Sequence, residues 1–158
     1  MAAIKPLAVR MLEQRKVPHE VFAFDNSIRS AQEVARVTGM PPEQVLKTLV
    51  VEHDPPKGKP MLVMVPSSLE IHLKVLAANI GAKKLRMASH RDAERHTGLQ
   101  VGGISALALT GGGFAVYIDE TAQLFDEVLV SAGQRGCDVR LSLADLLTLT
   151  GATLIRAL

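Results

Sequence analysis

Short stretches of alternating or uniformly apolar residues recur along this chain and predict strands, because successive strand side chains point to opposite faces. The predicted strands cover residues 19–24, 45–51, 61–65, 84–88, 114–119, 127–132 and 137–142. Turns rich in proline and glycine, DPPKGKP at 54–60 and GQRG at 133–136, separate several of them. The three glycines at 111–113 are interpreted as a flexible hairpin.

Helices are predicted where a capping residue, apolar spacing and a terminal glycine coincide. They cover about residues 6–15, 30–37, 67–80, 89–97 and 142–150, and a short helical turn follows Pro41. We expect Ser67-Ser68-Leu69-Glu70 to cap the third helix. Because strands and helices do not alternate regularly, the sequence predicts an α/β (α+β) fold, with a curled mixed β-sheet or small barrel surrounded by helices.

Length and composition fit one domain over residues 1–158, since 47% of the 158 residues are apolar. No apolar run approaches membrane-spanning length, and the charged N-terminus lacks the features of a secretory signal. The single cysteine, Cys137, cannot form an internal disulfide and is interpreted as a buried small hydrophobe. We therefore expect a cytoplasmic protein with no membrane partner.

Several classes of site are disfavoured by the residues present. One cysteine cannot build a multi-cysteine zinc site, and the five histidines lack the spacing of metal ligands. No Walker loop, dinucleotide fingerprint or Ser-His-Asp signature occurs. With four Phe, one Tyr and no Trp, an aromatic platform for single-stranded nucleic acid is not expected. The sequence predicts neither a metal nor a cofactor.

Charge is distributed unevenly, although the net charge is only +2. The segment 74–95 holds most of the excess positive charge, contributed by Lys74, Lys83, Lys84, Arg86, Arg91 and Arg95 against Asp92 and Glu94. Such a segment either meets RNA phosphates or forms an ordinary solvated surface. On composition alone, the solvated surface is the more frequent case.

Lys47 is the one charge on an otherwise aliphatic strand face, which it shares with Val45, Leu49 and Val51. A lysine held there is either an amine of lowered pKa or a cation for an anionic substrate group. The plainer alternative is a stem packed on the sheet with its ammonium group reaching water.

Two glycine-containing segments are candidates for binding. In VGGIS (101–105), adjacent glycines allow a ligand to approach the backbone, so that free N–H groups face an oxyanion; an ordinary turn is the alternative. SAGQRG (131–136) is explained fully by a β-turn with glycine at both ends; in a functional version, Arg135 or backbone amides would hold a phosphate or the substrate. Asp138 follows on the next strand, either as a counter-charge for Lys47 or as a surface acid.

Taken together, four motifs resemble the YbaK/ProX family of free-standing aminoacyl-tRNA deacylases, which are similar to the editing domain of prolyl-tRNA synthetase. The motifs are QVLKTL at 44–49, TG at 97–98 with VGGIS at 101–105, VSAGQRG at 130–136, and LL before TGA at 146–152. Their order and spacing extend along nearly the whole chain. Each motif is weak alone, and the set of four is specific.

The resemblance implies a trans-editing hydrolase that deacylates mischarged tRNA(Pro), with Cys-tRNA(Pro) or Ala-tRNA(Pro) as substrate. The expected partners are the 3′ aminoacyl end of mischarged tRNA and, as a candidate, prolyl-tRNA synthetase. The chain would act as a monomer or homodimer. A non-catalytic RNA-binding or regulatory module on the same scaffold is the alternative, and an enzyme that acts on a small amino-acid derivative without RNA is a further one.

The resemblance also assigns site residues. The catalytic set would be Lys47, Gly102 and Gly103, with the loop amides stabilising an oxyanion. The substrate-binding set would be Thr48, Ile104, Ser105, Ser131, Gly133, Arg135 and Asp138. Two departures from the family pattern stand out: Ala106 replaces a proline that helps to fix the loop, and Phe24 replaces a tyrosine, so that any hydroxyl role there is lost.

Overall fold

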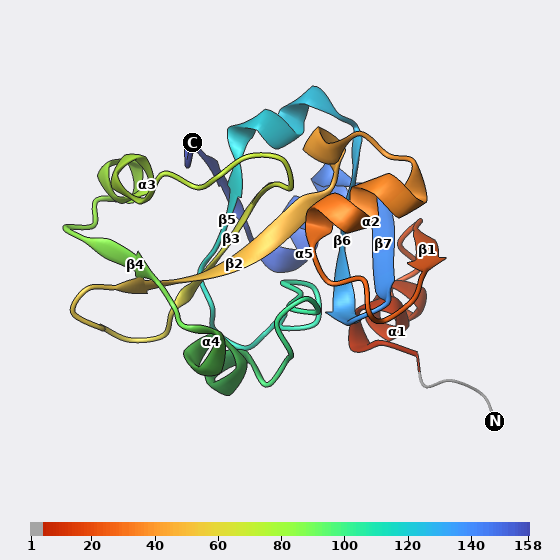
Figure 1. Ribbon diagram of the computed structural model, residues 1–158, viewed down its shortest axis with the longest axis horizontal. Coiled ribbons are helices and arrows are strands. Elements are labelled where there is room, and N and C mark those ends of the chain that lie inside the picture. The colour runs from red at the N-terminus through yellow and green to blue at the C-terminus, as the bar shows by residue number, and fades with distance from the viewer. Residues whose placement is uncertain (1–4) are drawn as a thin grey trace.

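The computed structural model describes residues 5–158 (Figure 1). Its helices are α1 (Leu7–Gln14), α2 (Ala31–Thr38), α3 (Leu73–Ile80), α4 (His90–Thr97) and α5 (Leu143–Thr150), with short 3₁₀ segments η1 (Pro42–Gln44) and η2 (Glu120–Leu124). Its strands are β1 (Glu20–Ala23), β2 (Leu46–His53), β3 (Met61–Pro66), β4 (Leu85–Met87), β5 (Val116–Asp119), β6 (Glu127–Gln134), β7 (Cys137–Ser142) and β8 (Thr153–Ile155). None of the helices in this part of the chain is long and apolar enough to span a bilayer.

The strands form two sheets, ordered β1-β7-β6 and β4-β2-β3-β5-β8. The β3–β5 and β5–β8 pairs are parallel and the others antiparallel, so the predicted mixed sheet is confirmed. A single parallel bridge between Val45 and Leu129 joins the two sheets. Within residues 5–158 the sheets do not close on themselves, so the alternative of a small barrel is wrong.

An open edge of β2 lies between the two sheets. On one side β2 pairs with β3 from Leu46 to Val51. On the other side, Val45 bridges β6, and β4 pairs only from Val51 onward. Between these contacts the β2 edge has no neighbouring strand within residues 5–158. Since no strand fills this position, the sheet parts here and leaves room for a cavity.

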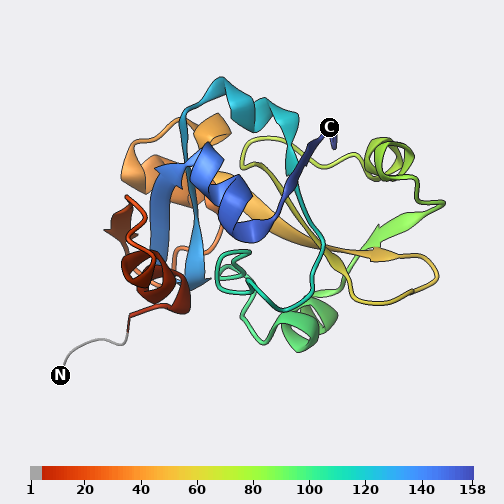
Figure 2. The same ribbon diagram turned by 180° about the vertical axis from the view of Figure 1, so that it is seen from behind.

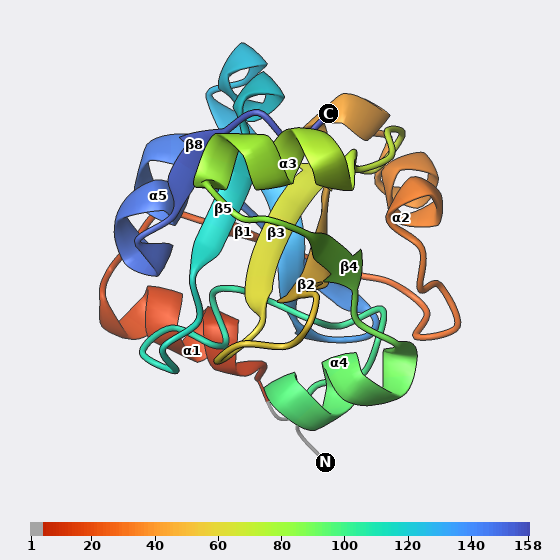
Figure 3. The ribbon, with the colours of Figure 1, turned by 90° about the vertical axis from the view of Figure 1, so that its left-hand side faces the viewer.

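Helices cover both faces of this arrangement. Figure 3 shows α3 lying across β3 and β5, where Leu76 and Ala77 pack on Val63 and Val65. Figure 2 shows α1 and α5 on the reverse side, over the sheet that contains β6 and β7. The helix α2 covers the junction of the two sheets, because its Val34 and Ala35 cluster with the bridging residues Val45 and Leu129. The cavity therefore lies beside a rigidly packed junction.

Serine caps form where the sequence predicts them. The Oγ atoms of Ser30, Ser89 and Ser142 each accept a hydrogen bond from the backbone N–H three residues later, at 3.1, 3.1 and 3.0 Å. Each cap satisfies a donor that the first helical turn leaves free. These helices begin within one residue of the predicted positions.

Three predictions of secondary structure are wrong. The side chain of His72 caps α3, so the helix begins at Leu73, while Ser67 donates its hydroxyl to the carbonyl of Pro42 at 2.6 Å. The glycines at 111–113 are not a hairpin, because the strand that follows them, β5, runs parallel to β3. The short strand β8 is absent from the prediction. The Ser67 hydroxyl and the strands β5 and β8 are all held by residues far apart in the sequence, which local patterns do not reveal.

Candidate functional site

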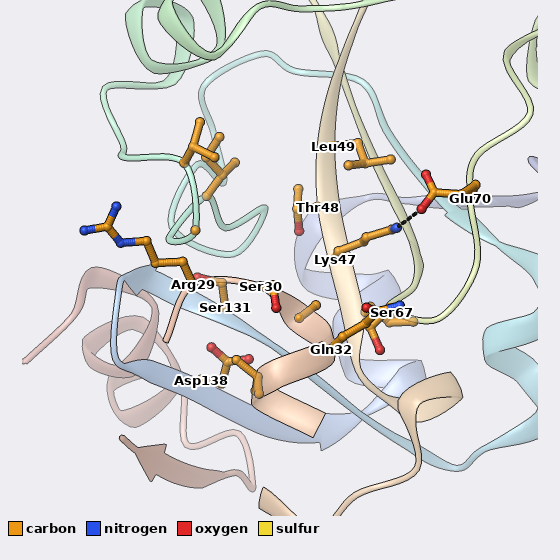
Figure 4. A pocket seen from close by; sticks show the side chains of 16 residues that line it. Arg29, Ser30, Gln32, Lys47, Thr48, Leu49, Ser67, Glu70, Ser131 and Asp138 are labelled. Atoms are coloured by element: carbon orange, nitrogen blue, oxygen red, sulfur yellow. Dashed lines mark hydrogen bonds and ion pairs between the residues drawn. The ribbon is translucent and has the colours of Figure 1, made fainter. Parts of the chain in front are cut away.

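A cavity of about 310 Å³ opens beside the free edge of β2 (Figure 4). Five parts of the chain form its walls: the start of α2, the strand β2, the segment before α3, the loop at 101–104 and the paired strands β6 and β7. Among the predicted site residues, the cavity is lined by Lys47, Thr48, Gly102, Ile104, Ser131 and Asp138. The fold thus brings together six predicted residues that are spread between positions 47 and 138 of the sequence.

Lys47 stands at the wall of the cavity with its side chain 23% exposed. Its Nζ atom lies 3.4 Å from Oε1 of Glu70, whose side chain is 90% exposed. Figure 4 shows Lys47 pointing toward Glu70, with Ser131 and Asp138 on the other side of β2. A pair of this kind is weak, because water solvates one partner. Another anion at the same place would therefore compete easily with Glu70 for the ammonium group.

The two adjacent glycines have different surroundings. Gly102 has a φ of +94° and lines the cavity, and its N–H has no hydrogen-bond partner within residues 5–158. The N–H of Gly103 donates to the carbonyl of Gln100 at 2.8 Å. It is therefore not free to stabilise an oxyanion, contrary to the expectation from sequence. A Cβ at Gly103 would lie 2.8 Å from the backbone carbon of Gln134. Gly103 therefore allows two backbone segments to pack closely.

Arg135 holds the glycine loop from outside the cavity. Its Nε atom donates to the carbonyl of Val101 at 2.9 Å. The same Nε would lie 3.4 Å from a Cβ at Gly102. Arg135 is not among the residues that line the cavity. This geometry therefore does not favour the direct contact with substrate that the sequence predicts. The side chain instead ties the loop to the turn between β6 and β7.

Ser105 and Gly133 are placed behind the cavity wall. Ser105 is 1% exposed, and its Oγ accepts a hydrogen bond from the N–H of Ala108 at 3.1 Å. Gly133 has a φ of +109°, and a Cβ there would meet the Cβ of Ala108 at 3.0 Å. Both residues shape the loop without lining the cavity. Ser131 does line it, and its Oγ accepts from the N–H of Gly133 at 3.2 Å.

Asp138 is a buried carboxyl group that faces the cavity. It is 7% exposed and lies opposite Ser131 in the β6–β7 ladder. Within residues 5–158 its carboxylate takes part in no hydrogen bond or ion pair, and burial raises its pKa to about 7. The expectation of a surface acid is wrong, because the group is buried. The expectation of a counter-charge for Lys47 is also wrong, because Lys47 pairs with Glu70.

Sequence reasoning missed several residues of the cavity wall. The start of α2 contributes Arg29, Ser30 and Gln32, and the segment before α3 contributes Ser67 and Glu70. The capping box at Ser30 predicts where α2 begins but not what lies beside it.

The interpretation of Cys137 as a buried small hydrophobe is confirmed. Cys137 is 6% exposed, and burial raises the pKa of its thiol.

Comparisons with known proteins agree on one family. A family model described as an aminoacyl-tRNA editing domain matches residues 25–149. The "Putative Cys-tRNA(Pro)/Cys-tRNA(Cys) deacylase EbsC" of Enterococcus faecalis is 36% identical over 148 residues, which are 92% of this chain and 88% of that protein.

Solved structures share the fold over almost their whole length. The crystal structure of a "putative trans-editing enzyme for prolyl tRNA synthetase" has a TM-score of 0.81 at 26% identity and covers 98% of both chains. The crystal structure of a hypothetical protein, APE2540, has a TM-score of 0.84 at 19% identity, over 96% of this chain and 98% of the other. At 19% identity, the similarity to APE2540 shows a shared fold and nothing about function.

Proposed function

Because this chain belongs to the aminoacyl-tRNA editing domain family, we propose that it is a trans-editing deacylase that removes cysteine or alanine from mischarged tRNA(Pro). Support for the substrate comes from a relative named for Cys-tRNA(Pro) and from a structural neighbour named for prolyl-tRNA synthetase. A synthetase pocket cannot strongly reject a slightly smaller amino acid, since a missing methylene is worth only ~1–3 kcal/mol. A second hydrolytic site corrects the resulting errors.

One observation carries the proposal: Lys47, Gly102, whose N–H has no hydrogen-bond partner within residues 5–158, and the buried Asp138 all line one small cavity. Its volume of about 310 Å³ is near the lower end of the range for ligand pockets. A cavity of this size suits a small aminoacyl group on a terminal ribose. Aliphatic side chains from Leu46, Leu49 and Ile104 form much of the remaining wall.

The positions of the charged groups suggest how the substrate lies. At the buried end, Asp138 accepts hydrogen bonds from the α-ammonium group of the amino acid. At the end near Glu70, the Lys47 ammonium displaces its weak partner and holds the terminal ribose or phosphate. The ester carbonyl lies against the loop at 101–104, where the N–H of Gly102 donates to the developing oxyanion.

The bond changes need no protein nucleophile. Water, or the thiol of a cysteine substrate, adds to the ester carbonyl carbon. The bond from that carbon to the ribose oxygen breaks, and the ribose oxygen takes a proton to regenerate the tRNA hydroxyl. When water attacks, it supplies that proton and the free amino acid leaves. When the thiol of the substrate attacks, the thiol supplies the proton and the cysteine leaves as a cyclic thioester. The residues named above orient the ester and stabilise charge, which is how positioned groups accelerate such a reaction.

The decisive experiment measures release of amino acid from a panel of tRNA(Pro) charged with cysteine, alanine or proline. We expect rapid hydrolysis of the cysteinyl or alanyl ester and little of the prolyl ester. Lys47→Ala should lower kcat/KM by roughly 100-fold, because a misplaced substrate loses about that much. Lys5→Ala, which removes an exposed lysine paired with Glu13, is the matched control. No hydrolysis of any panel member would favour a non-catalytic RNA-binding module instead.

A further inference from the structure

A second cleft, with a volume of about 770 Å³, lies at the far end of β2 from the cavity. One wall is the turn that begins at His53 and contains Lys57, and the other is the connection between α3 and β4. That connection carries Lys83 and Lys84 into the wall. The cleft is therefore built from two segments that are distant in sequence and is rich in lysine.

The charge inside this cleft is positive. Lys57 and Lys83 are exposed and take part in no ion pair within residues 5–158. Asp54 is the only acid among the lining residues, and it lies 3.4 Å from Nζ of Lys84. Two lysines thus remain without a partner of opposite charge.

Neighbouring basic residues are occupied by other contacts. Arg86 lies 3.7 Å from carboxylate oxygens of both Glu52 and Asp54. Lys59 donates a hydrogen bond to the carbonyl of Gly112 and forms a cation–π contact with Phe114, with Nζ 5.0 Å from the ring centre. Lys57 and Lys83 therefore place unpaired positive charge in the cleft itself, whereas Lys74 and Arg91, which are also exposed and have no ion pair within residues 5–158, lie outside it.

The cleft and the cavity are connected by a single strand. β2 carries Lys47 at the cavity and His53 at the cleft, and Figure 1 shows it running from α2 to the loop at the edge of the molecule. Six residues of strand correspond to about 20 Å, at roughly 3.3 Å per residue. A stacked nucleic-acid strand, at about 3.4 Å per nucleotide, covers that distance in about six nucleotides.

We propose that the cleft between residues 53–58 and 81–84 binds phosphates of the tRNA acceptor stem while the aminoacyl end occupies the cavity. This inference rests on the proposed function, which places the 3′ end at Lys47. About six nucleotides from that end, the strand has reached the paired stem. Lysine ammonium groups bind phosphates as point charges without reading sequence, so they position the RNA and leave discrimination to the cavity.

The test measures binding of uncharged tRNA by fluorescence anisotropy over a range of salt concentrations. The variant is Lys57→Glu with Lys83→Glu, and the matched control is Arg10→Glu with Arg15→Glu, which makes the same change of charge at α1. Figure 1 shows α1 at the opposite end of the molecule from the cleft. Lys57→Ala with Lys83→Ala should act in the same direction with a smaller loss.

We expect the cleft variant to bind tRNA at least ten times more weakly at low salt and the control to change less than two-fold. The slope of log K against log salt should fall by about 1.8, since each contact with a duplex phosphate contributes about 0.9. Equal losses in the two variants, or no loss in either, would overturn the inference. Because binding is measured without catalysis, failure to hydrolyse any charged tRNA would contradict the proposed function alone.

Discussion

The Nε atom of Arg135 donates a hydrogen bond of 2.9 Å to the carbonyl oxygen of Val101 and so ties the β6–β7 turn to the glycine loop. Next to this bond, Gly103 packs against the backbone of Gln134 at a distance that no Cβ allows. The loop is therefore held from behind by two contacts. This support fixes the position of Gly102 at the cavity wall.

Replacing Arg135 with alanine should release the loop and lower kcat/KM by about 10- to 100-fold, because misplacing a reacting group costs up to about 100-fold. Arg135→Lys should not restore activity, since a lysine ammonium does not occupy the Nε position of the guanidinium fork. Steady-state kinetics on charged tRNA(Pro) would show the effect mainly in kcat. Arg36→Ala, at an exposed position on α2, is the control, and an equal loss there would exclude a specific role for Arg135.

The Oε1 atom of Glu70 lies 3.4 Å from the ammonium group of Lys47. If an anionic part of tRNA replaces it, then Glu70→Gln should lower KM for charged tRNA by about two- to five-fold, since a weak exposed pair is lost. The thermal midpoint should stay within about 1 °C, because a surface pair contributes little to the free energy of unfolding. A raised KM would show instead that Glu70 assists substrate binding.

Ala106 occupies the first position of a turn capped by Ser105, whose Oγ accepts from the N–H of Ala108. Proline is favoured at the first position after such a cap, and the N–H of Ala106 has no hydrogen bond to lose within residues 5–158. Ala106→Pro should therefore raise the free energy of unfolding by about 0.4–1 kcal/mol by restricting the unfolded chain. Denaturant titration would measure this gain.

Activity of the Ala106→Pro variant should remain within about two-fold of wild type, because the turn already forms with alanine. Its hydrogen bonds include one from the Leu109 N–H to the Ser105 carbonyl at 3.2 Å and one from the Thr110 hydroxyl to the Leu107 carbonyl at 2.8 Å. A destabilised variant would mean that the pyrrolidine ring clashes within the buried loop.

Asp138 should make the protein less stable as pH rises from about 4 to about 7. Burial raises its pKa from 3.8 to about 7, so in this window the folded state retains a proton that the unfolded state has lost. The contribution should level off above pH 7. At about 1.4 kcal/mol per pH unit, it amounts to at most about 4 kcal/mol.

The matched variant is Asp138→Asn, which has no group to titrate. It should equal wild type in stability near pH 4 and exceed it at pH 8, as measured by denaturant titration at several pH values. For charged tRNA its KM should rise about ten-fold or more, because a neutral amide cannot pair with the substrate ammonium. Parallel stability curves for the two proteins would mean that Asp138 is ionised at an ordinary pKa.

Parts of the candidate site follow from local sequence and parts do not. The isolated charge on an aliphatic face singles out Lys47, and adjacent glycines single out the loop at 101–105. Neither pattern distinguishes Gly102, with its N–H facing no partner, from Gly103, whose N–H is bound to Gln100. The close packing of Gly103 on the backbone of Gln134, more than thirty residues along the chain, is likewise a tertiary contact that the pair of glycines does not reveal.

Sequence alone determined the serine caps of α2, α4 and α5, most strand positions and the family motifs, because these depend on neighbours within a few residues or on residue type. Tertiary structure alone decided that β2 has an open edge, that Asp138 is buried beside it, and that Lys47 faces Glu70. Strand pairing and burial are set by packing between distant segments. Whether a carboxyl group faces water or a cavity depends on those segments and not on its own neighbours in the chain.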